Sequence, residues 1–421
     1  MAMRRTLFLE LFEFFRSTRW IVFGIENVVV KRFLFTLLFL IFSAHLQAVH
    51  AQTRDHKGQE FFFAFLPNPI DPLTLQVGLH ADNETKVLVE YPVGVPLSDS
   101  ITVLPGQVTI VDIPQEAGEQ SGWPGHTFGQ GDNNSIRVSA TQAIACYLIS
   151  RNDASSDGGL AIPTNALHKN YVVMSYDIGS QTDGDASLFA VIAAHDSTRI
   201  TITPVRNLES AFPPGEPFSV LLKKGEAFLA ESAFGFFGKD STLAGSFIKS
   251  TKPVSVINGN KCSRVPFGNP SCDHLFEVAQ PIQTWGKHVL VTALGEESIR
   301  PSGAVYRILT SAPNTTVLLD GQPLGTISEN QFLDTDTLRG SHLFTADNPI
   351  FVTQFMTSKV TANSASADPG MVNMIPTGQF ADSYTFSIPS NAQSVPLFEN
   401  NRVTVIIKNE DIGKFTLNST V

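Results

Sequence analysis

Two cysteines and their neighbours offer the clearest chemistry in this chain of 421 residues. Cys262 and Cys272 lie ten residues apart, and the segment between them holds two prolines, a glycine and an asparagine, which favour a turn over a continued strand. In an exported chain, such a pair predicts a disulfide across a loop. The alternative is a metal site with His274 as a third ligand, but a structural zinc site needs four ligands. We therefore expect a disulfide, no metal ion and no cofactor.

Three side chains are candidate ligand contacts. Arg264 and Phe267 lie inside the predicted disulfide loop, and Trp123 lies in a Gly-Trp-Pro-Gly run. A cation and aromatic rings of this kind are common in binding hot spots. The remaining cysteine, Cys146, lies in the apolar run 144–149, which predicts a buried thiol; an intermolecular disulfide is the alternative.

Motifs for catalysis are missing from the sequence. It contains no G-x-S-x-G nucleophile elbow and no H-E-x-x-H zinc motif. Asp183 and Asp185 flank a glycine, but their spacing fits a polar turn better than a calcium loop. We expect no catalytic residues and a protein that is not an enzyme. The competing hypothesis is a secreted glycan-active enzyme, whose carboxylate pair, about 5–9.5 Å apart, would be assembled only by the fold.

The N-terminal stretch predicts export. The basic pair Lys31-Arg32 precedes the apolar run 33–42, and small residues follow up to Ala51, which together predict a signal peptide over residues 1–51. Ten apolar residues are too few to cross about 30 Å of hydrocarbon; an uncleaved anchor is the alternative. We expect a secreted, extracellular protein with no membrane span after cleavage.

Charge and sequons agree with an extracellular location. A formal net charge of −10 argues against a nucleic-acid partner. Four sequons predict N-linked glycans, and their asparagines are Asn83, Asn133, Asn314 and Asn418.

The rest of the chain predicts an all-β fold. Short runs of Val, Ile, Thr and Phe alternate with Gly, Pro, Asn and Asp turns, as in 85–91, 198–203 and 402–407. Period-two alternation predicts half-buried strands. Only 16% of the residues are charged, which is low for a chain of long helices.

The strands recur as copies in the same order. One element is shared by 136–146, 247–256 and 343–352, and another begins at Pro163, Pro281 and Pro376. These copies predict tandem β-sandwich-like units of about 100 residues, with a propeller-like ring of β units as the alternative. The predicted ranges are 58–177, 186–296 and 303–390, with the start of a fourth, truncated unit at 398–421.

The second copy resembles a known family. Its lysine-proline-valine strand leads into Cys262, Cys272 precedes Asp273-His274, and Pro281 is followed by Trp285-Gly286. These residues, with the G-x-E-F start at Gly58, resemble the N-terminal domain of the IgG Fc-binding protein family over about residues 58–421.

The resemblance implies an extracellular binding or adhesion module without known catalytic residues. The mucin-like members continue into von Willebrand D modules, which this chain lacks, so we do not expect it to assemble mucus networks. No ligand motif can be matched residue by residue, so IgG binding itself is not carried over. We expect an extracellular glycoprotein or glycan as the ligand.

Overall fold

A computed structural model describes the fold of most of the chain. The chain divides into two compact units, Met1–Arg54 and Asp55–Val421. The described residues all belong to the second unit: 56–68, 73–118, 132–152, 155–179, 185–209, 212–233, 238, 240–293, 303–358, 369–381, 383–384, 403–414 and 416. The predicted signal peptide lies outside them. No helix among these residues has both the length and the apolar character that a membrane crossing requires.

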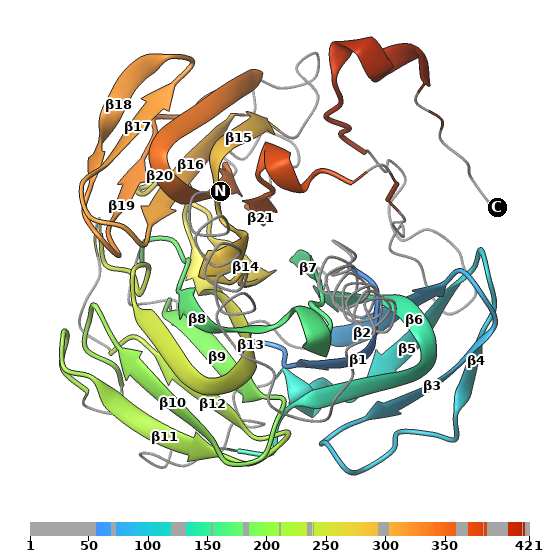
Figure 1. The fold of residues 1–421 in the computed structure, drawn as a ribbon. Helices are drawn as coiled ribbons and strands as arrows, with labels where there is room; N and C mark the ends of the chain where they lie inside the picture. Colours follow the sequence, from blue (N-terminus) through green and yellow to red (C-terminus); the bar gives the residue numbers. More distant parts are fainter. Residues whose placement is uncertain are drawn as a thin grey trace, which may run out of the picture. The chain divides into compact units, whose positions relative to one another are not determined.

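The second unit contains three seven-stranded antiparallel sheets of the same topology (Figure 1). The first sheet holds β1 (Gly58–Phe63), β2 (Thr74–Ala81), β3 (Thr85–Glu90), β4 (Ile101–Val103), β5 (Val108–Ile113), β6 (Ile136–Arg151) and β7 (Ser156–Leu160). The second holds β8 (His168–Val172), β9 (Ser187–Ala193), β10 (Thr198–Thr203), β11 (Phe218–Leu222), β12 (Ala227–Glu231), β13 (Phe247–Ser263) and β14 (Asp273–Val278). The third holds β15 (Gly286–Thr292), β16 (Ala304–Thr310), β17 (Thr315–Leu319), β18 (Gln322–Ile327), β19 (Phe332–Asp334), β20 (Ser341–Met356) and β21 (Met371–Met374). The prediction of an all-β chain of repeated units is thus confirmed.

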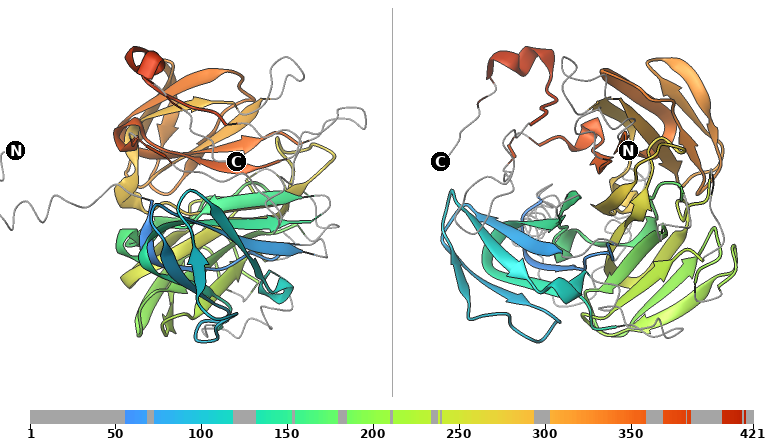
Figure 2. Two further views of the ribbon diagram at one scale, coloured as in Figure 1. Left: turned by 90° about the vertical axis from the view of Figure 1, so that its right-hand side faces the viewer. Right: turned by 180° about the vertical axis from the view of Figure 1, so that it is seen from behind.

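One long strand organises each sheet. In the second sheet, the first half of β13 pairs with β8 and β10, and its second half pairs with β9 and β14. β6 and β20 divide their partners in the same way, and Figure 2 shows the three sheets from two further directions. The two halves enclose a core of their own, in which Ile248 from the first half and Val256 from the second belong to one apolar cluster. Each unit is therefore sandwich-like, with the long strand shared by both layers.

The sheets do not follow the predicted ranges of the units. Strand β8 lies inside the range predicted for the first unit, but it pairs with β13 of the second sheet. Strand β15 likewise pairs with β20 of the third sheet. The prolines that recur in the sequence precede short 3₁₀ turns, η3 (Thr164–Ala166) and η4 (Ile282–Thr284), which lead into these strands. The sequence pattern shows the order of the elements but not their partners, so it assigned each of these strands to the preceding unit.

The C-terminal segment differs from the expected strand. The described residues 403–408 contain no strand, and a 3₁₀ helix, η6 (Asn409–Lys414), follows them. Val405 is 45% exposed. An alternating apolar pattern forms a strand only where another strand receives its backbone hydrogen bonds, and the described residues provide none here.

Candidate functional site

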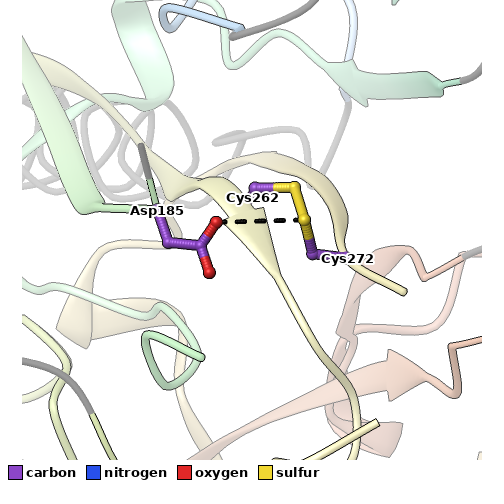
Figure 3. Close-up of side chains that lie close together, drawn as sticks. All are labelled: Asp185, Cys262 and Cys272. Carbon is purple, nitrogen blue, oxygen red and sulfur yellow. Dashed lines mark hydrogen bonds between the residues drawn. A yellow bond between two sulfur atoms is a disulfide. The ribbon is translucent and has the colours of Figure 1, made fainter. Parts of the chain in front are cut away.

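The predicted disulfide loop joins the last two strands of the second sheet. Cys262 lies near the end of β13 and Cys272 directly precedes β14, and a disulfide joins them with a Cα–Cα distance of 5.3 Å (Figure 3). A closed loop of this size contributes roughly 2–3 kcal/mol by restricting the unfolded chain. The loop is thus held at its base by a covalent bond.

Asp185 lies beside the disulfide, although no sequence pattern connects it with the cysteines. Its Oδ1 atom lies 3.8 Å from Cys272 Sγ, and its Oδ2 atom accepts a hydrogen bond from Arg264 Nη1 at 2.6 Å. The Asp185 side chain is fully buried, and the side chain of Arg264 is only 14% exposed. Arg264 therefore points inward to an ion pair. From the sequence it was a candidate ligand contact, which would require it to point outward from the loop.

The loop also reaches the third sheet. Val265 N–H donates to Ser358 Oγ at 2.8 Å, and Ser358 N–H donates to Val265 O at 2.6 Å. Val265 is fully buried in an apolar cluster with Phe355 of β20. Asn269 Nδ2 donates to Val265 O within the loop. These contacts hold the loop at both ends, and Phe267 between them is 41% exposed.

The other residues singled out by sequence lie apart from this loop or outside the described residues. Trp123 and Asn418 are outside the described residues. The remaining sequon asparagines, at Asn83, Asn133 and Asn314, are exposed. Cys146 is buried and free, and burial raises the pKa of its thiol far above the ordinary value, so it is unreactive.

His274, the sequence's candidate metal ligand, is a core residue. It is fully buried, burial lowers the pKa of its imidazole to about 4, and its Nδ1 atom lies 3.3 Å from Lys261 O. Within the described chain, the side chains grouped closely enough to bind a metal ion are those of Asp185, Cys262 and Cys272, without His274.

A half-buried carboxyl group lies where β14 of the second sheet contacts β7 of the first sheet and β21 of the third. Glu277 of β14 accepts hydrogen bonds from Val278 N–H at 2.9 Å and from Asn373 N–H of β21 at 3.4 Å. A Cβ atom at Gly159 of β7 would lie 3.2 Å from Glu277 Oε1, so glycine leaves room for the carboxyl group. Burial raises the pKa of Glu277 to about 7.

A buried arginine joins the second and third sheets. Arg307 of β16 is 0% exposed, and its Nη2 atom donates to Asp177 Oδ1 at 3.0 Å and to Asp334 Oδ2 at 2.7 Å. Its guanidinium lies 4.7 Å from the ring centroid of Tyr176 and 3.8 Å from that of Phe332. Two carboxylates and two rings thus compensate a charge that would be costly to bury alone.

Breaking the disulfide is expected to destabilise the chain without unfolding it. Cys262→Ser should lower the melting temperature, because it removes roughly 2–3 kcal/mol of loop constraint. The apolar clusters of the chain do not depend on this bond: one is shared by the first and second sheets and another lies within the third. Differential scanning calorimetry measures the change. Thiol titration of the unsubstituted protein, after denaturation without reduction, should find one reactive thiol. Three reactive thiols would contradict the disulfide.

The fold and this loop define a class of protein: repeated β units, of which the second presents a loop closed by a disulfide. A family model described as IgGFc binding protein matches residues 157–421. The chain therefore belongs to the IgGFc-binding protein family. A human protein named IgGFc-binding protein is 24% identical over 204 residues, which cover 48% of this chain. The chain spans only 3% of the length of that relative.

Proposed function

We propose that this chain is a secreted, non-enzymatic extracellular binding protein whose ligand is a glycoprotein. Membership of the IgGFc-binding protein family is the observation that carries the proposal. The human relative is named for IgG Fc binding, and only the general property of binding a protein partner is extended to this chain. The predicted signal peptide and the exposed sequon asparagines support an extracellular location.

The contact surface we propose is the loop between Cys262 and Cys272, centred on Phe267. The loop is closed by the disulfide and held to the third sheet through Val265 and Ser358. An exposed aromatic ring on a constrained loop loses little conformational entropy on binding, which favours affinity. Arg264 contributes by fixing the loop through Asp185 rather than by touching the ligand.

One observation favours the competing function, a secreted glycan-active enzyme. Glu277 has a pKa raised to about 7, as a general acid requires. Its two oxygens, however, accept hydrogen bonds from backbone N–H groups inside the contact between sheets. A general acid must reach the glycosidic oxygen of a substrate, whereas these hydrogen bonds engage both oxygens of Glu277 inside the protein. We therefore place the binding function first.

Substituting Phe267 tests the proposed surface. The full chain is measured by biolayer interferometry against IgG Fc, a mucin glycoprotein and isolated glycans. Phe267→Ala should weaken binding to the glycoprotein at least tenfold, because anchors of this kind carry about 2 kcal/mol or more. Leu221→Ala, which removes a 54% exposed side chain from β11, is the matched control and should bind like the native chain.

Two results would overturn the proposal. Equal binding by native chain and Phe267→Ala would remove the loop as the contact surface. Hydrolysis of a glycan by the native chain, together with no stable binding to any probe, would favour the enzyme.

A further inference from the structure

We propose that Asp185, Cys262 and Cys272 form a zinc site when the disulfide is reduced. The carboxylate lies just before β9, and the cysteines flank the loop between β13 and β14. One ligand atom from each residue lies within 4.8 Å of the others (Figure 3). The inference is independent of the proposed ligand-binding function and departs from the expectation that the chain holds no metal.

The carboxylate already lies at coordination distance from one sulfur. With Zn–S bonds of about 2.3 Å and Zn–O bonds of about 2.1 Å, tetrahedral geometry separates an oxygen ligand from a sulfur ligand by roughly 3.6 Å. Asp185 Oδ1 and Cys272 Sγ are 3.8 Å apart. Reduction allows the two sulfur atoms to separate, which is the one rearrangement that the ligand set needs.

Arg264 completes the site without being a ligand. It donates to Asp185 Oδ2, while Asp185 Oδ1 lies beside Cys272 Sγ. Ligating carboxylates are commonly oriented by such hydrogen bonds. Two thiolates and one carboxylate carry three negative charges, and Zn²⁺ with the Arg264 guanidinium carries three positive charges. The charges of these five groups therefore balance, which matters because Asp185 and Cys262 are buried.

The metal-bound and disulfide-bonded forms exclude each other. Cysteines are synthesised as thiols, so each molecule passes through the reduced state before it oxidises. A dithiol reductant regenerates that state: two electrons and two protons pass to the sulfur atoms, and the reductant becomes a disulfide. Zinc binding then releases the two thiol protons to solvent. Cys272 is partly exposed, so the ion enters from its side and a water molecule fills the fourth position.

Metal titration of the full chain tests the inference. After reduction with a phosphine, the protein should bind one equivalent of Co²⁺ with the charge-transfer absorbance of thiolate ligation, and one equivalent of Zn²⁺ should displace it. Zinc should protect two thiols from alkylation. The oxidised protein should show neither effect. Asp185→Asn should weaken binding at least tenfold, whereas Cys146→Ala, which removes the buried free thiol, should bind like the native chain.

Each contrary result overturns the inference. Failure of the reduced native chain to bind metal removes the site, and equal binding by the oxidised chain places the metal elsewhere. Native-like affinity of Asp185→Asn removes the carboxylate from the ligand set. If Asp185→Asn fails to fold, thiol protection in the native chain decides: two protected thiols support the site, and none refutes it.

Discussion

Replacing Arg307 with methionine is expected to lower the free energy of unfolding by about 3–5 kcal/mol, as when one partner of a buried ion pair is removed. Methionine fills much of the same volume, but it leaves Asp177 and Asp334 facing each other without a cation. Asp177 is 2% exposed, so water cannot take the place of the guanidinium. Urea unfolding of the native chain and the variant measures the difference.

A surface arginine provides the control. Arg199→Met removes an exposed guanidinium from β10 and should change stability by less than about 0.5 kcal/mol. Adding Asp177→Asn to Arg307→Met should restore part of the loss, because it removes one of the uncompensated charges. Equal stability of Arg307→Met and Arg199→Met would show that the buried cation does not hold the two sheets together.

Glu277→Gln is expected to change how stability depends on pH. The folded-state pKa of Glu277 is about 7, against an ordinary value of 4.5, because the surrounding protein desolvates its carboxyl group. Between these values the folded chain keeps the proton and the unfolded chain releases it, so stability falls as pH rises. The shift corresponds to a loss of about 3 kcal/mol, complete above about pH 7. Glutamine cannot ionise, so the variant should not show this loss.

His274, on the same strand, acts in the opposite direction. Burial lowers the pKa of its imidazole from 6.5 to about 4, so stability rises as pH increases across that range. The two groups offset each other in the native chain between about pH 4.5 and 6.5, whereas Glu277→Gln should become more stable across this range. Chemical denaturation at several pH values measures the profiles, with Glu84→Gln, an exposed glutamate, as control. Parallel profiles for the native chain and Glu277→Gln would contradict the prediction.

Local patterns in the sequence were enough to predict individual strands. The predicted run 198–203 coincides with β10, whose side chains alternate between buried and more exposed. The shared element at 136–146 lies within the long strand β6. Both depend on period-two alternation, which a single strand displays by itself. The run 402–407 has the same alternation, but its described residues form no strand, because pairing depends on a partner that the local pattern does not show.

The residues that hold the site together could not be predicted in this way. Asp177 lies 130 residues before Arg307, and Asp185 lies 87 residues before Cys272. Each is one acidic residue among the 39 Asp and Glu residues of the chain, and nothing near it in sequence indicates its partner. The cysteines were found because both the residue type and the ten-residue spacing are rare signals.

The shared long strand determines when each sheet can be completed during synthesis, because it is the sixth of the seven strands in each sheet. Gly58 of β1 pairs with Ile144 of β6, 86 residues later, and His168 of β8 pairs with Val254 of β13 at the same separation. At about 5–20 residues per second, a ribosome needs roughly 4–17 s to add such a stretch. During that time the apolar residues of β1, Phe61 to Phe63, have no partner strand. Newly made chains therefore expose unpaired apolar strands for seconds at a time, three times in succession. We expect the yield of folded protein to depend on chaperones that cover those strands.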